Sequence, residues 1–257
     1  MSKKTGNKNE HIMIPDTQLR AGVAYDHIVA CGNYICDKRP ETIVVIGDWW
    51  DLPSLNGYEK PGSAYFEGVS FAEDIEFPNH VMSEFLRPID KMKVKGYRPR
   101  FVFTEGNHEY RLQRLIDSDP VKYRGVYSRE MFNLKHFEVH PFLDIVTIDG
   151  IMYSHYFCNP QSLLRGVLGG QMDNRLNKLK RSFTQGHQQA HITGSQFLPD
   201  GSRIRGLVSG AFYQHEEEYQ GPQGQNYWRG VSYKHEVRDG NYDLMEVSLQ
   251  YLLDNWL

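Results

Sequence analysis

Side chains of the types that bind divalent metal ions recur along the chain, each set directly after a segment predicted to be a strand. Carboxylate and amide oxygens occur with imidazole nitrogens, while the three cysteines form no pair with zinc-ligand spacing. This donor chemistry suits Mn, Fe, Zn or Mg. It offers more ligands than one ion needs, so two ions sharing a carboxylate is the economical interpretation. The candidates are Asp16, Gln18, Asp48, Asp51, Asn107, His108, His155 and His187.

Three early strands are predicted to position the first of these residues, over residues 11–15, 42–46 and 100–104. The second of them, TIVVI, is apolar without alternation, which is typical of a strand buried on both faces. Helical spacing of apolar residues predicts helices over 21–37 and 72–95, the latter interrupted by its prolines. Because sites in α/β sheets form beyond the carboxyl ends of strands, the polar residues are expected to meet at one sheet edge.

The rest of the chain shows weaker patterns. An Asp-Gly turn within 137–157 predicts a hairpin, and later segments predict one helix and two strands, over 161–181, 203–212 and 242–252. Residues 213–235 have little periodicity and are expected to form a loop or lid near the site. The polar residues 1–10 are expected to be a flexible tail, with 11–257 as a single domain.

Composition excludes several classes of protein. The chain has 257 residues, a hydrophobic content of 40% and a formal net charge of -3. This hydrophobic content argues against intrinsic disorder, and no apolar run is long enough to span a membrane. The near-neutral charge argues against nucleic-acid binding by bulk electrostatics, although it permits a local basic groove. The polar N-terminus resembles no signal peptide, so a cytoplasmic location is expected.

Five short motifs, taken in order, resemble those of the calcineurin-like metallophosphoesterase superfamily. They are DTQ (16–18), GDWWD (47–51), GNHE (106–109), SH (154–155) and GHQQ (186–189), spanning residues 11 to about 191. The DTQ opening followed by GDWWDLPSL is most similar to metallophosphoesterases encoded by bacteriophages, which would place the protein in the host cytoplasm. The resemblance implies an α/β fold with two mixed β-sheets packed face to face and helices on both outer sides.

The resemblance also implies a role for each candidate. Asp48 matches the carboxylate that bridges two metal ions, and a hydroxide between those ions matches the nucleophile. His108 matches the general acid, which Asp51 orients; a carboxylate that accepts from one ring nitrogen raises the basicity of the imidazole. The first ion would be held by Asp16 and Gln18, and the second by Asn107, His155 and His187.

Three departures from the family pattern bear on metal choice and substrate. Glutamine stands at positions 18 and 189, where the family usually has histidine. A first metal site richer in neutral oxygen should bind its ion more loosely and favour Mn, with Mg, Zn, Ni and Fe as alternatives. Leu52 follows GDWWD where the protein phosphatases have a phosphate-holding arginine, which argues against a phosphoprotein substrate.

Position 189 competes with position 191 for the first metal. In an extended segment, residues two apart face the same side and lie about 6.6–6.8 Å apart, whereas residues four apart are separated by about 13 Å. Because the preceding residues predict a strand, we expect Gln189 to be a ligand through its amide oxygen. His191 is then a wall residue.

Metal-dependent hydrolysis of a phosphodiester is therefore the function expected from the sequence. The substrate is a phosphoester, with a nucleotide or nucleic acid among the candidates, and the oligomeric state is left open. One alternative is a DNA or RNA nuclease of the same superfamily. Another is a binding protein that kept the fold and lost the first metal. Trp49 and Trp50 are expected in the core, whereas the aromatic residues of 213–229 remain candidates for base stacking or a lid.

Overall fold

The computed structural model describes residues 7–161, 166–216, 221 and 227–257, which form two mixed β-sheets. The first sheet has six strands in the order β11-β10-β1-β2-β3-β4, and the second has five in the order β5-β6-β7-β9-β8. In the first, β1 to β4 run parallel, while β10 pairs antiparallel with both β1 and β11. In the second, β6, β7 and β9 run parallel between antiparallel edge strands.

The strands of the first sheet are β1 (Asn7–Ile14), β2 (Pro40–Val45), β3 (Arg100–Thr104), β4 (Glu138–His140), β10 (Gly230–Arg238) and β11 (Asn241–Ser248). Those of the second are β5 (Val146–Ile148), β6 (Ile151–Tyr153), β7 (Ser182–Gln185), β8 (His191–Phe197) and β9 (Arg203–Ser209).

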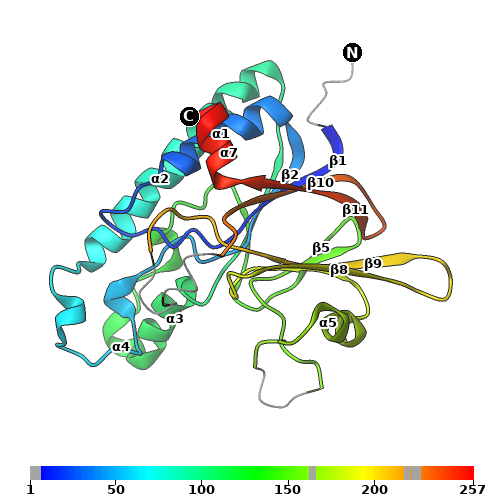
Figure 1. Ribbon diagram of the computed structural model, residues 1–257. Coiled ribbons are helices and arrows are strands. Elements are labelled where there is room, and N and C mark those ends of the chain that lie inside the picture. Colours follow the sequence, from blue (N-terminus) through cyan, green and yellow to red (C-terminus); the bar gives the residue numbers. More distant parts are fainter. Residues whose placement is uncertain (1–6, 162–165, 217–220, 222–226) are drawn as a thin grey trace.

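The sheets pack face to face, and helices cover their outer faces (Figure 1). Side chains alternate along each strand, so Ile43 and Val45 face the helices while Val44 faces the second sheet. Helices α1 (Asp26–Lys38), α2 (Phe71–Met92) and α7 (Leu249–Trp256) cover the six-stranded sheet. Helix α5 (Met172–Leu179) covers the five-stranded sheet. This layered architecture confirms the expected α/β fold.

Short helices and 3₁₀ turns lie in the segments between β2 and β4. Helices α3 (Glu109–Ser118) and α4 (Pro120–Tyr123) follow β3 directly. Single 3₁₀ turns are η1 (Pro53–Leu55), η2 (Ala64–Phe66), η3 (Lys93–Lys95) and η4 (Arg129–Met131). No helix in the described ranges is long and apolar enough to cross a membrane.

Several element boundaries differ from those predicted. Strand β1 begins at Asn7, so residues 7–10 belong to the sheet and not to a tail. Residues 230–235 lie in β10, and 232–234 pair with β1, so the predicted loop of 213–235 is too long. Its residues 217–220 and 222–226 lie outside the described part. The polar Lys234 and His235 hide the alternation of apolar residues in this strand, whose pairing with β1 holds it in the sheet.

Two helices also differ from the prediction. Helix α2 continues through Pro78 and Pro88, because burying its apolar face outweighs the hydrogen bonds that the prolines remove. At the C-terminus, the predicted strand of 242–252 ends at Ser248. The Ser248 hydroxyl accepts a hydrogen bond from the Tyr251 N–H and so caps α7.

Candidate metal centre

The turn after β2 is held in place by a single buried carboxylate. Glu109, at the start of α3, accepts hydrogen bonds from the backbone N–H groups of Gly106, Asp48, Trp49 and Trp50 at 2.7, 2.9, 2.7 and 3.0 Å. The turn needs this support because Asp48 adopts a left-handed φ of 53°. Burial, followed by the neighbouring Asp48 charge, raises the pKa of Glu109 to about 7. The Asp48 carboxylate is thereby fixed beyond the end of β2.

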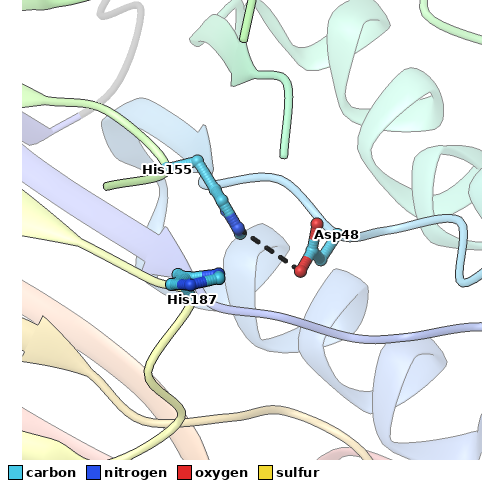
Figure 2. Close-up of side chains that lie close together, drawn as sticks. All are labelled: Asp48, His155 and His187. Atoms are coloured by element: carbon cyan, nitrogen blue, oxygen red, sulfur yellow. Dashed lines mark ion pairs between the residues drawn. The ribbon is translucent and has the colours of Figure 1, made fainter. Parts of the chain in front are cut away.

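Side chains from both sheets converge on this carboxylate (Figure 2). The Nε2 atom of His155, which follows β6, lies 3.3 Å from Asp48 Oδ2. One ligand atom from each of Asp48, His155 and His187 lies within 4.8 Å of the others. Asn107 Oδ1 lies 2.9 Å from His155 Nε2 and 2.8 Å from His187 Nδ1. We call Asp48, Asn107, His155 and His187 the ligand cluster.

Asp16 lies beside the ligand cluster, at the end of β1. Its Oδ1 atom accepts a hydrogen bond of 3.0 Å from the backbone N–H of His187. Its Oδ2 atom is buried and has no hydrogen-bond partner within the described residues. A side chain at Gly186 would collide with Asp16 Oδ1, so glycine permits this approach of β7 to β1. Burial raises the pKa of Asp16 to about 7. An ionised carboxylate with an unpaired buried oxygen is costly unless a cation neutralises it.

Electrostatics of the ligand cluster favour a cation next to Asp48. Burial lowers the pKa of His155, but the Asp48 charge outweighs burial and raises that pKa to about 10. Burial alone would raise the pKa of Asp48, but the charges of His108 and His155 lower it below its usual value. By contrast, burial and the nearby His155 charge lower the pKa of His187 to about 4, which leaves its imidazole neutral. The protonated His155 supplies positive charge next to Asp48. A metal ion bound at the same place would supply that charge instead.

His108 and Asp51 form a pair next to the ligand cluster. His108 Nδ1 donates to both the backbone oxygen and Oδ1 of Asp51, at 2.8 and 2.9 Å. Its Nε2 atom lies 3.8 Å from Asp48 Oδ2. Burial lowers the pKa of His108, but the Asp48 charge and the Asp51 hydrogen bond raise it to about 9. The pair therefore presents a protonated nitrogen toward the metal centre.

The two glutamines share burial and an unusual backbone conformation. Gln18 and Gln189 are buried and have left-handed φ angles of 44° and 56°. Gln189 Oε1 accepts a hydrogen bond of 2.8 Å from the Tyr213 hydroxyl. The structure therefore gives this oxygen a protein partner, and the role of Gln189 as a metal ligand stays a prediction.

The extended geometry assumed for residues 187–191 is wrong. His187 has a φ of 66°, so the chain bends between His187 and Gln189. His191 begins β8, where its ring centroid lies 4.3 Å from that of Trp228 and its Nδ1 atom 3.6 Å from Glu246. The role of His191 as a wall residue stays a prediction.

Two arginines near His108 were not identified from the sequence. Arg20 donates to Asp51 Oδ2 at 2.8 Å. Arg111 donates to the backbone oxygens of Asp51 and Leu52 at 2.9 and 3.2 Å, and its Nη2 atom lies 3.3 Å from His108 Nε2. A usable signal was the i, i+3 spacing of His108 and Arg111 at the start of a predicted helix, which places both on one face.

No family model and no curated protein matches the chain. Among solved structures, it is similar to YfcE, a phosphoesterase from E. coli, with a TM-score of 0.42 and 11% identity over 93% of this chain and 99% of that chain. A second solved structure has a TM-score of 0.43 and 10% identity, with the same coverage of 93% and 99%. At these levels of similarity, a functional conclusion depends on the side chains of the metal centre.

Proposed function

We propose that the protein is a metal-dependent phosphoester hydrolase that acts on phosphodiesters and uses two divalent ions, with Mn as the preferred metal. The observation that carries the proposal is the convergence of Asp48, His155 and His187, whose ligand atoms lie within 4.8 Å of one another. These residues come from three chain segments and both sheets, so folding must bring them together against their mutual desolvation. The unpaired Oδ2 atom of Asp16 supports a cation beside them.

The donors divide into two sets that share Asp48. Asn107, His155 and His187 would hold one ion together with the Asp48 carboxylate. Asp16 would hold the other ion, with Gln18 and Gln189 as neutral oxygen donors. When bound, such ions place positive charge on the phosphate oxygens and lower the pKa of water. Binding must release the proton from His155, so metal affinity should fall as the pH is lowered.

His108 would supply the proton that the leaving oxygen needs. Its Nδ1–H is committed to Asp51, so Nε2 is the atom that can donate toward the substrate. The raised pKa of about 9 keeps this nitrogen protonated at neutral pH. Proton donation of this kind contributes a factor of about 10² to 10⁴ to the rate.

Arg111 would compensate for the arginine that the sequence lacks after GDWWD. Its guanidinium lies 3.3 Å from His108 Nε2, where it can attract a phosphate oxygen that approaches the general acid. Its contacts with two backbone oxygens fix its orientation without neutralising its charge.

The proposal can be tested by counting metal and measuring hydrolysis on the same preparation. After loading with Mn and removing excess, mass spectrometry should find two ions per chain. Bis-p-nitrophenyl phosphate should then be hydrolysed faster than p-nitrophenyl phosphate, and a chelator should abolish both activities. A protein that binds no metal, or binds it without hydrolysing either ester, would contradict the proposal and favour the binding-protein alternative.

A further inference from the structure

A cavity opens next to the His108–Asp51 pair, between the segment that follows Asp51 and helix α3. Its volume is about 480 Å³, and its lining includes Ser54, Leu55, Asn56, Phe66, Arg111 and Arg114. Ligand sites for small molecules have volumes of about 300–1,000 Å³, so the cavity can hold a group of nucleotide size. None of these lining residues belongs to the ligand cluster.

Two guanidinium groups give this cavity a positive wall. Arg111 and Arg114 are three residues apart on α3 and therefore lie on the same helix face. In the described part of the chain, neither is paired with a carboxylate: the contacts of Arg111 are backbone oxygens and His108, and Arg114 is exposed at the cavity rim. Two arginines on the same helix face, neither of which forms an ion pair among the described residues, are suited to a phosphate group.

The position of Arg111 relates the cavity to the reaction. The same side chain lines the cavity and lies 3.3 Å from His108 Nε2. A general acid donates its proton to the oxygen that leaves, so the group that departs with this oxygen lies on the His108 side. The cavity is therefore next to the leaving group and not to the phosphoryl group that stays with the metal centre.

The remaining lining is apolar or neutral. Leu55, Phe66 and Leu115 provide apolar surface, and Asn56 provides an amide beside them. An aromatic ring and aliphatic side chains next to paired arginines match a nucleoside that carries a phosphate. A simple alkyl or aryl leaving group would give Arg111 only the scissile phosphate and leave the Arg114 guanidinium without an anionic partner.

We infer that this cavity binds the leaving group of the substrate, and that the leaving group is a nucleoside bearing a second phosphate. The inference rests on the proposed phosphodiesterase function and narrows its substrate class. Arg114 is the residue that contacts the second phosphate, while Arg111 lies between that phosphate and the scissile one. Arg114 therefore determines specificity, and its effect should depend on whether the substrate carries the additional phosphate.

The test compares three thymidine dinucleotides: one without a terminal phosphate, one with a 5′-phosphate and one with a 3′-phosphate. For the wild-type protein loaded with Mn, we expect kcat/KM to be at least about tenfold higher for one phosphorylated dinucleotide, mainly through a lower KM. The end that carries the effective phosphate reports which nucleoside leaves. In Arg114→Gln the preference should fall to about one, while Arg114→Lys should retain part of it.

Arg98→Gln is the matched control. Arg98 is also exposed but precedes β3, at the opposite end of the sheet, so its substitution removes the same charge far from the cavity. This variant should keep the preference of the wild type. Equal kcat/KM values for all three dinucleotides in the wild type, or an unchanged preference in Arg114→Gln, would overturn the inference.

Binding to metal-free protein separates failure of the cavity from failure of the proposed function. Calorimetry with thymidine 3′,5′-bisphosphate should show binding that weakens about tenfold in Arg114→Gln and not in Arg98→Gln. If bis-p-nitrophenyl phosphate is hydrolysed but the bisphosphate binds equally to both variants, only the cavity assignment is wrong. If no ester is hydrolysed while Arg114→Gln still weakens binding, the cavity assignment stands and the hydrolase proposal fails.

Discussion

Two groups of buried polar side chains join the same two sheets, and they differ in how their atoms are satisfied. The ligand cluster joins them beyond the carboxyl ends of the strands. A second group, His11, Tyr153, Thr184 and Lys234, joins them within the strands, and we call it the inter-sheet cluster. There, Lys234 Nζ donates to the Tyr153 hydroxyl at 3.1 Å and to Thr184 Oγ1. His11 contacts that hydroxyl at 2.8 Å and Asp149 at 2.9 Å.

The inter-sheet cluster is hydrogen-bonded within itself and to Asp149, and its basic side chains are held neutral. Burial lowers the pKa of Lys234 well below its usual value and, together with Lys234, lowers that of His11 to about 4. In the ligand cluster, burial is outweighed at His155 and Asp48, which keep opposite charges. Buried side chains that stay charged indicate a binding site, and here they lie beside Asp16, whose Oδ2 atom has no hydrogen-bond partner among the described residues. A buried group that is neutral and paired indicates a structural contact.

Backbone conformation follows the same division. Asp48 and His187 have left-handed φ angles of 53° and 66°, as do Gln18 and Gln189 beside them. No residue of the inter-sheet cluster has a positive φ. Left-handed conformations cost about 1–3 kcal/mol each in residues other than glycine, and they cluster at functional sites. The metal centre thus combines strain with charge, whereas the inter-sheet cluster has neither.

The largest effect is expected from Asp48→Asn, which neutralises the only charge common to both metal sets. Both ions should then bind weakly, because the two cations would repel each other without the carboxylate between them. Hydrolysis of bis-p-nitrophenyl phosphate should fall to background, and metal counting should find fewer than two ions per chain. An active Asp48→Asn protein would show that the ligand cluster is a structural contact, like the inter-sheet cluster, and would contradict the two-metal hypothesis.

His108→Ala should separate the general acid from the metal ligands. We expect turnover of an alkyl phosphodiester to fall by a factor on the order of 10² to 10⁴, with two Mn ions still bound. For bis-p-nitrophenyl phosphate the loss should be smaller, because p-nitrophenolate leaves without a proton. Loss of both metals from this variant would instead make His108 a ligand.

Lys234→Met tests the inter-sheet cluster through its effect on the free energy of unfolding. In the wild type, unfolding allows Lys234 to take up a proton that it does not hold when buried. The free energy of unfolding should therefore rise with pH between the lowered folded pKa and 10.5, by up to about 1.4 kcal/mol per pH unit. Urea titrations from pH 7 to 9.5 avoid the titration of His11, and Lys234→Met should remove this contribution and increase stability at pH 7.

The control for this experiment is Lys95→Met, at an exposed position of η3. It should keep the pH dependence of the wild type. The catalytic activity of Lys234→Met should also match the wild type, because no hydrogen bond among the described residues joins these four side chains to the candidate metal centre. A Lys234→Met protein with an unchanged dependence on pH would show that Lys234 stays charged in the fold.

The smallest effects are expected from substitutions near the ion that Asp16, Gln18 and Gln189 are proposed to hold. Gln189→Ala should raise the Mn concentration needed for half-maximal activity by a few-fold, and Gln189→His should lower it and improve tolerance of Zn. His191→Ala should change metal dependence little, since its neighbours are Trp228 and Glu246. If His191→Ala loses one metal and Gln189→Ala does not, the assignment of position 189 is wrong.

Much of the fold could be predicted because local patterns report on burial. The apolar run TIVVI predicts a strand covered on both faces, and Val44 and Val45 are indeed fully buried on opposite faces. Strand β10 escaped prediction because its polar Lys234 is buried by pairing across the sheets, which no local pattern records. Residues 249–252 were likewise predicted as part of a strand, since Ser248, which ends β11 and caps α7, looks like any strand serine without the following turn.

By itself, the sequence determined the residue types of the candidate metal centre, their order and the strand ends that carry them. Only the tertiary structure decided which atoms meet: the bend at His187, the hydrogen bond between Gln189 and Tyr213, and the approach of Arg111 to His108. The physical reason is that strand ends are specified by local burial. The direction of a side chain beyond a strand depends on φ angles and on partners that are distant along the chain.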